Sequence, residues 1–293
     1  QELEGAAHGV FGMRWHSTSL ILSIFSVSPC VDISICDIEI HQDVDNLSLP
    51  HTRSALLGPC SQRSAVLALG TDTITRVWDL QTKSCTRELA IDINEIKEKS
   101  WGPDGKRIAT WSRSDGKVRV WEVRTGTCMK ELEGLDQGLL DVSWGQEEKT
   151  LACMYGSGIV RVWDVATGET LRSAQVCEYC SRARPVCQVQ DERLVVFDGQ
   201  DQIRTINLSG SYGCLQNLPK FENSFIDFYS TTGWCRKTNV IAISANSSVQ
   251  LLDVRSLTVK KLQGPEEGVG ELSWGPDGRR LAGVSGAWGR VWV

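Results

Sequence analysis

The chain contains 293 residues, 41% hydrophobic and 23% charged, which is the composition of a soluble globular protein. Its formal net charge of −5 argues against a general nucleic-acid binder, because such proteins carry excess cations that neutralise phosphates. Its strongest apolar run, residues 20–27, is much shorter than the roughly 20 residues of a membrane helix, so no membrane segment is predicted.

The spacing of the cysteines and the first residues of the chain bear on the cellular compartment of the protein. Eleven cysteines are irregularly spaced, which is typical of reduced thiols rather than of a disulfide framework. No secretion signal follows Gln1, so a cytoplasmic or nuclear protein is predicted. A first residue other than Met indicates a fragment or an excised domain.

One segment recurs along the chain. It reads SWGPDGKRIATWSRSDGKVRVWEV at residues 100–123 and returns as SWGPDGRRLAGVSGAWGRVWV at residues 273–293. Its last part also occurs at residues 74–80 and 159–165. Such a segment is one supersecondary unit used repeatedly, so the repeat period decides the fold.

Trp-Asp or Trp-Glu pairs end three of the units. They begin at Trp78, Trp121 and Trp163, with spacings of 43 and 42 residues. The same period extends to seven positions, each of which ends an alternating strand: Cys36, Trp78, Trp121, Trp163, Ile206, Leu252 and Trp292.

Each unit is predicted to contain four strands. In chain order these are an inner strand such as residues 139–144, a second such as residues 107–110 or 193–197, a third that ends at the Trp position, and an outer strand such as residues 128–132.

Turn signals separate these strands. Gly-Pro-Asp-Gly at residues 102–105 and 275–278 is typical of a type I turn, with Pro at the second position and Gly at the fourth. Residues 93–99 have helix propensity, but the repeat places them on an inner strand.

These residues and spacings resemble the WD40-repeat β-propellers, whose units of about 40–45 residues form four-stranded blades. The resemblance predicts an all-β fold and a single domain spanning residues 1–293. The domain is expected to be a seven-bladed propeller of antiparallel blades. The family pattern begins one strand out of phase, so residues 2–4 are expected to complete the last blade beside residues 289–293 and close the ring.

The resemblance also implies a structural hydrogen-bond network of His, Ser or Thr, Asp and Trp within a unit. The positions that match some part of it are His51, Asp72, Trp78, Thr110, Asp115, Trp121, Trp163 and Trp292. Because His51 and Asp72 occupy structural positions of the pattern, a catalytic pair is not favoured. The repeated Trp side chains are expected to fill space between blades rather than bind an aromatic ligand.

Two further motifs lie near residue 180. Cys177, Cys180 and Cys187 could be part of a zinc site, but a structural site needs four ligands, and no second Cys-x2-Cys occurs. Neither a metal site nor a cofactor is predicted. The basic run at residues 181–185 is either a pocket for an acidic or phosphorylated motif or a solvated loop.

The resemblance implies a non-catalytic scaffold that binds other proteins or peptide segments. In such propellers, loops that enter the inner strand and loops between the second and third strands share one face. Here those loops hold His8, Arg53, Lys97, Asp136, Arg182, Arg184 and Glu267, with Arg113 nearby.

Two alternatives remain open. One is a regulatory or sensor propeller cut from a larger protein. The other is an enzyme with a site in the central channel, which is less favoured because the inner strands at residues 10–15, 139–144 and 269–274 carry few catalytic groups.

Overall fold

The structure is a computed structural model. It describes residues 2–3, 10–15, 21–27, 31–37, 39, 42–49, 54–57, 66–70, 75–79, 82–89, 98–102, 104–111, 116–135, 138–145, 149–176, 184–189, 193–197, 203–207, 215–217, 232–235, 237–245, 247–256, 258–264, 268–285 and 291–292. The chain divides into two compact units, residues 1–88 with 223–293 and residues 89–222, and each is described by itself.

The described strands form seven antiparallel sheets of four strands. In the first compact unit, one sheet contains β2 (Val10–Trp15), β3 (Ile21–Val27), β4 (Val31–Asp37) and β5 (Gln42–Leu49). The next contains β6 (Ser54–Leu57), β7 (Val66–Gly70), β8 (Thr75–Asp79) and β9 (Ser84–Leu89). The third contains β22 (Thr232–Cys235), β23 (Val240–Ala245), β24 (Ser248–Asp253) and β25 (Thr258–Gln263).

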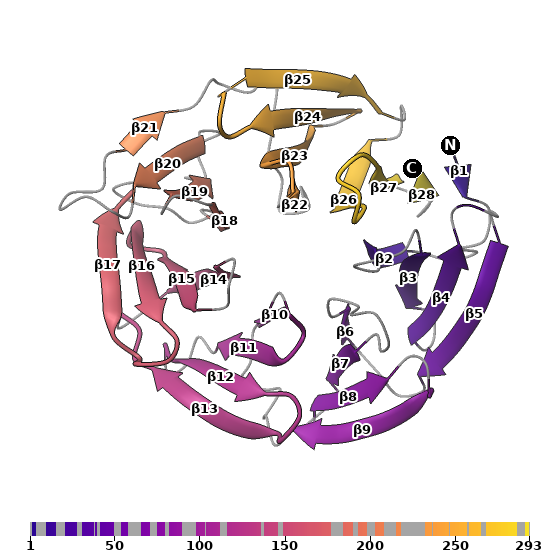
Figure 1. Ribbon diagram of the computed structural model, residues 1–293, viewed down its shortest axis with the longest axis horizontal. Helices are drawn as coiled ribbons and strands as arrows, with labels where there is room; N and C mark the ends of the chain where they lie inside the picture. Colours follow the sequence, from indigo (N-terminus) through magenta and orange to yellow (C-terminus); the bar gives the residue numbers. More distant parts are fainter. Residues whose placement is uncertain are drawn as a thin grey trace. The chain divides into compact units, whose positions relative to one another are not determined.

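The fourth sheet of this unit joins the two ends of the chain. It contains β26 (Val269–Trp274), β27 (Leu281–Ser285), β28 (Val291–Trp292) and β1 (Glu2–Leu3). Strand β1 pairs with β28, so that Glu2 lies opposite Trp292 and Leu3 opposite Val291. The fourth strand of this sheet therefore comes from the other end of the sequence (Figure 1).

The second compact unit contributes three sheets. The first contains β10 (Glu98–Trp101), β11 (Arg107–Trp111), β12 (Val118–Glu122) and β13 (Thr127–Leu132). The second contains β14 (Leu139–Trp144), β15 (Thr150–Tyr155), β16 (Ile159–Asp164) and β17 (Thr170–Gln175). The third contains β18 (Arg184–Val189), β19 (Arg193–Phe197), β20 (Ile203–Asn207) and β21 (Leu215–Asn217).

The two Gly-Pro-Asp-Gly segments form hydrogen-bonded turns between an inner strand and the second strand of the same sheet. In Gly-Pro-Asp-Gly, the Gly105 N–H donates to the Gly102 carbonyl at 3.1 Å, and the Gly278 N–H donates to the Gly275 carbonyl at 3.0 Å. These are the bonds between fourth and first residues that the type I prediction requires. Part of the segment with helix propensity, Glu98–Lys99, lies in β10, while residues 93–97 fall outside the described residues.

A β-bulge recurs just before the closing position of three units. The pairing of third and outer strands shifts between Ile35 and Cys36, between Val120 and Trp121, and between Val162 and Trp163. A bulge adds local twist and re-aims the side chain that follows. Three of the repeated units therefore share this β-bulge as well as their strands.

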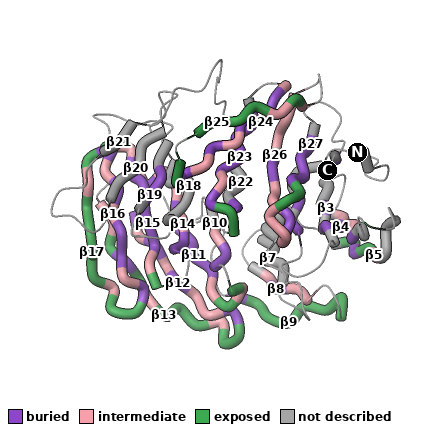
Figure 2. The backbone as a smooth tube through the Cα atoms, turned by 45° about the horizontal axis from the view of Figure 1, so that its top comes forward, coloured by how far each residue is buried: buried purple, intermediate pink, exposed green. Residues whose placement is uncertain are grey.

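Where burial is described, it falls from the inner part of a sheet to its outer strand. In the sheet β14–β17, the second strand β15 is buried from Leu151 to Tyr155, while five of the six residues of β17 are exposed. Figure 2 shows the same contrast between β15 and the outer strands β13 and β17. The main core cluster of the second compact unit lies between the sheets β10–β13 and β14–β17 and includes Trp111, Leu132 and Trp163.

Candidate functional site

The structure describes one of the eight charged residues expected on the binding face. Seven of them fall outside the described residues: His8, Arg53, Lys97, Arg113, Asp136, Arg182 and Glu267. Arg184 is the first residue of β18, where its backbone lies opposite Phe197 of β19. The binding face therefore stays a prediction from the sequence.

The structural network is visible in part in the sheet β10–β13. The Trp121 Nε1 donates to the Thr110 hydroxyl at 2.9 Å, from the third strand to the second. His51, Asp72 and Asp115 fall outside the described residues, so their part in the network stays a prediction. Trp292 lies in β28 with its backbone opposite Glu2 and Gly283.

The strand register places Cys153 in β15 where β11 has Thr110. Thr110 lies opposite Arg119, and Cys153 lies opposite the corresponding Arg161. A step of 42 residues along the sequence from Thr110 would instead reach Ala152. The hairpin β15–β16 is one residue shorter than β11–β12, so only the structure reveals the correct equivalent.

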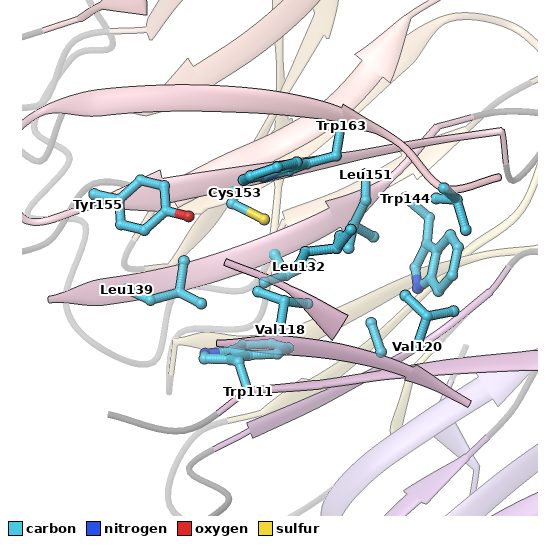
Figure 3. Close-up of a cluster of buried hydrophobic side chains, with 13 residues drawn as sticks. Trp111, Val118, Val120, Leu132, Leu139, Trp144, Leu151, Cys153, Tyr155 and Trp163 are labelled. Carbon is cyan, nitrogen blue, oxygen red and sulfur yellow. The ribbon is translucent and has the colours of Figure 1, made fainter. Parts of the chain in front are cut away.

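Because Cys153 stands where β11 has Thr110, no threonine hydroxyl is present at this position to accept a hydrogen bond from Trp163. The Nε1 of Trp163 is buried and makes no well-formed hydrogen bond among the described residues, although it interacts weakly with the Cys153 thiol and the Tyr155 hydroxyl. Figure 3 shows Cys153, Tyr155 and Trp163 in one buried cluster. Burial raises the pKa of the Cys153 thiol and of the Tyr155 hydroxyl well above their ordinary values. A thiol with a raised pKa is a poor nucleophile, so the arrangement favours a structural role over a catalytic one.

An arginine recurs two residues before the closing Trp. Arg76 Nε donates to Glu88 at 2.9 Å, and Arg119 Nε donates to Glu131 at 3.0 Å, in both cases from the third strand to the outer strand. These pairs lie at the same place in successive repeats. They are exposed and salt-screened, so they organise the surface more than they stabilise the fold.

Arg161 is the arginine at this position in the third repeat, and it has no glutamate opposite it on the outer strand. It lies opposite Ser173 rather than a glutamate. Its guanidinium carbon lies 5.2 Å from the centroid of the Trp163 ring, a cation–π contact, and its Nε is buried without a partner among the described residues.

The acidic residue of the Trp-Asp pair organises the turn that follows it. The Asp164 carboxylate accepts hydrogen bonds from the backbone N–H groups of Ala166 at 2.9 Å and Thr167 at 2.8 Å. Asp253 does the same for Arg255 and Ser256, at 2.8 and 3.1 Å. The Thr167 N–H lowers the pKa of Asp164 below its ordinary value. The repeated acid is thus explained by turn geometry.

Inner-strand tryptophans link neighbouring sheets. Trp144 Nε1 donates to the Ser100 carbonyl at 3.1 Å, and Trp15 Nε1 donates to the Ser273 carbonyl at 3.0 Å. In both cases the acceptor precedes the tryptophan that ends the neighbouring inner strand. These tryptophans end inner strands that the repeat predicted, but the sequence did not reveal this contact.

The outer strands make a second kind of link. Lys130 of β13 donates from its Nζ to the Thr167 carbonyl at 3.1 Å, in the turn of the next sheet. Asp45 occupies the corresponding place in β5 and accepts from Lys83 at 2.5 Å. Hydrogen bonding to Lys83 lowers the pKa of Asp45. In one contact the lysine lies on the outer strand, and in the other the outer strand supplies the acceptor and the lysine lies in the neighbouring sheet.

The described residues contain no group of three or more His, Cys, Asp or Glu side chains placed to hold a metal ion. Cys177 and Cys180 fall outside the described residues, and Cys187 lies in β18. Among the described residues, no helix is long and apolar enough to span a membrane.

The chain is similar in structure to the β-propeller domain of Cps50 (Swd1) from Myceliophteria thermophila, with a TM-score of 0.74 and 17% sequence identity. The similarity covers 99% of this chain and 96% of the other. No protein-family model and no curated protein sequence matches the chain. Together with the four-stranded antiparallel sheets, the comparison confirms the predicted all-β propeller fold, while the number of blades and the closure of the ring stay predictions. The chain therefore has the fold of a β-propeller domain.

Proposed function

We propose that this chain is a seven-bladed propeller that acts as a non-catalytic scaffold for protein–protein interaction. The observation that carries the proposal is the likeness to a β-propeller domain over 99% of the chain. Such a fold presents loops on a rigid framework, and loops of this kind commonly bind partners.

Three features of the structure support the proposed ring. The described strands form seven sheets, and β1 pairs with β28 across the two ends of the chain. Trp15 and Trp144 each donate to the neighbouring inner strand, which is a contact suited to a repeated joint. We propose that β1 closes the ring, because an open array would expose an unpaired sheet edge.

The proposed partners are proteins or peptide segments bound by loops at the ends of the inner strands. Lys97 and Arg182 carry positive charge, Asp136 and Glu267 carry negative charge, and His8 is neutral at pH 7. A mixed ring of charge selects partners by the placement of their charges. Arg182 and Arg184 are the leading candidates for partner contact, because a guanidinium group can form bidentate hydrogen bonds with a carboxylate or a phosphate.

The proposed compartment is the cytoplasm or the nucleus. Cys85 and Cys128 are exposed free thiols on the outer strands β9 and β13. Exposed unpaired thiols suit a reducing compartment.

The test is affinity capture with the purified chain, followed by mass spectrometry and by binding measurements with each partner recovered. The variant Arg182→Glu/Arg184→Glu is expected to weaken partner binding while the thermal melting curve stays intact. The matched control Lys260→Glu/Lys261→Glu makes the same charge change on the exposed outer strand β25 and is expected to bind like the wild type. Unchanged binding by the arginine variant would remove that loop from the proposed site.

A further inference from the structure

A second charged surface lies at the other end of the strands from the loops proposed above. It is formed by three turns: residues 237–239 between β22 and β23, residues 254–256 between β24 and β25, and residues 275–280 between β26 and β27. Because the strands alternate in direction, these turns lie at the end of their sheets opposite the start of each inner strand.

The three turns are in contact with one another. The Val254 N–H donates to the Asn239 carbonyl at 3.1 Å, which joins the first two. A Cβ placed on Gly278 would lie 3.0 Å from the Cys235 sulfur and 3.1 Å from Thr238 Cγ2, so the third turn packs closely against the first. Figure 1 shows β22 and β26 as neighbouring inner strands. The turns therefore form one continuous surface.

The exposed charged side chains of this surface are mainly cations. Lys237, Arg255, Arg279 and Arg280 are all exposed, and we call this set the basic turn surface. In the described part of the chain, the side chains of Lys237 and Arg279 make no hydrogen bond, although the Arg279 charge acts on Asp277 and helps to lower its pKa. Arg255 is oriented by a neutral group, since its Nε and Nη2 donate to the Asn239 side-chain oxygen, both at 3.0 Å, in the amide orientation that satisfies both residues.

The two carboxylates of the same turns are already engaged. Asp253 accepts from the backbone N–H groups of its own turn, those of Arg255 and Ser256. Asp277 accepts from the Arg279 N–H at 2.9 Å, and its second oxygen pairs with Arg280 at 2.9 Å. Among the described residues of these turns and of the adjoining end of β24, four cations stand against two carboxylates, which leaves a net positive surface on a chain whose total charge is −5.

We propose that the basic turn surface binds an acidic segment of a partner protein through its Asp and Glu side chains. Guanidinium forks and an ammonium group match carboxylates directly. A short acidic segment would cover these cations without meeting the rest of the acidic chain. A long nucleic acid extends past a small basic patch and would be repelled by a chain whose net charge is −5. The basic turn surface shares no residue with the loop of Arg182 and Arg184, so this inference and the scaffold proposal can fail separately.

The experiment uses the full chain and a short fluorescein-labelled oligo-glutamate peptide, with binding followed by fluorescence anisotropy at several salt concentrations. The wild type is expected to bind the peptide, and binding is expected to weaken as salt increases. Lys237→Glu/Arg279→Glu is expected to weaken binding about tenfold or more. Arg280 is left unchanged in this variant because it pairs with Asp277.

The matched control is Lys260→Glu/Lys261→Glu, which makes the same change in total charge on the exposed outer strand of the same sheet. It is expected to bind the peptide within about twofold of the wild type. If the reversed variant fails to fold by circular dichroism, Lys237→Gln/Arg279→Gln replaces it and is expected to show a smaller loss in the same direction.

Three results would overturn the inference. The first is a wild type that does not bind the acidic peptide. The second is an equal loss in the turn variant and the outer-strand control, which would mean that only total charge matters. The third is tighter binding of a single-stranded oligonucleotide of equal charge than of the peptide, which would assign the surface to nucleic acid.

Discussion

The indole nitrogen of Trp144 donates a hydrogen bond to the carbonyl of Ser100 at 3.1 Å, from one sheet to its neighbour. Trp15 repeats this contact with Ser273 at 3.0 Å, although these two residues are 258 positions apart in the sequence. The inner-strand tryptophan thus fills space in the core and also donates a hydrogen bond that links neighbouring sheets.

Trp144→Phe is expected to lower the free energy of unfolding, because it removes this donor and leaves a ring in place. The lost hydrogen bond should cost about 1 kcal/mol beyond the effect of the smaller ring. Trp111→Phe is the matched control: Trp111 is buried, but its Nε1 has no partner among the described residues. Urea unfolding of both variants measures the difference. Equal losses would show that the bond to Ser100 contributes nothing.

Thr110→Val should destabilise the chain because it leaves the Trp121 indole N–H without its acceptor at nearly constant volume. The expected loss is about 1–3 kcal/mol. Thr110→Ser retains the hydroxyl and should recover most of that loss. A serine variant as unstable as the valine variant would assign the effect to methyl packing.

Cys153→Thr is expected to stabilise the chain, because Cys153 occupies the place of Thr110 and the buried Trp163 N–H makes no well-formed hydrogen bond, only weak interactions with Cys153 and Tyr155. A new hydrogen bond of this kind should add about 1 kcal/mol. Ala152→Thr is the comparison, since Ala152 belongs to a different buried cluster and a larger side chain there should overpack it. Thermal melting separates the two. A stabilised Ala152→Thr variant would show that the 42-residue step, and not the register, identifies the equivalent.

Gly134→Ala should be strongly destabilising. A Cβ on Gly134 would lie 2.1 Å from the Gly116 carbonyl oxygen, a backbone atom that a side-chain rotation cannot move. The expected cost is about 3 kcal/mol. Gly156→Ala is the control, because a Cβ there would come no closer than 3.4 Å to its nearest neighbour, Gly138 O. A mild effect at Gly134 in chemical denaturation would mean that the two loops can separate.

Asp164→Asn should make stability less dependent on pH. The Thr167 and Ala166 N–H groups hold the pKa of Asp164 below its ordinary value, so the ionised form stabilises the fold. This contribution is present above the unfolded pKa and is lost as pH falls through the lower folded pKa. The wild type should be more stable than the variant near neutral pH, and the two should converge in acid. Urea midpoints measured across the acidic range test this. A constant difference would assign the effect to geometry rather than charge.

Much of the fold could be predicted from the sequence, because the relevant signals are local and repeated. The inner strands expected at residues 10–15, 139–144 and 269–274 coincide with β2, β14 and β26, and the second strand expected at residues 193–197 coincides with β19. Alternation of apolar side chains, the Gly-Pro-Asp-Gly turns and a 42–43-residue period all follow from short-range chemistry. The same signals placed residues 2 and 3 beside the last third strand, where β1 pairs with β28.

Only the tertiary structure decided which side chains meet across strands and sheets. A hairpin shorter by one residue places Cys153, and not Ala152, opposite Arg161, and a one-residue change in register exchanges the two faces of a strand. The bond from Trp15 to Ser273 and the joining of three turns into the basic turn surface depend on how neighbouring sheets pack. A sequence pattern specifies the face of each strand, whereas contacts between distant strands depend on packing that acts through space.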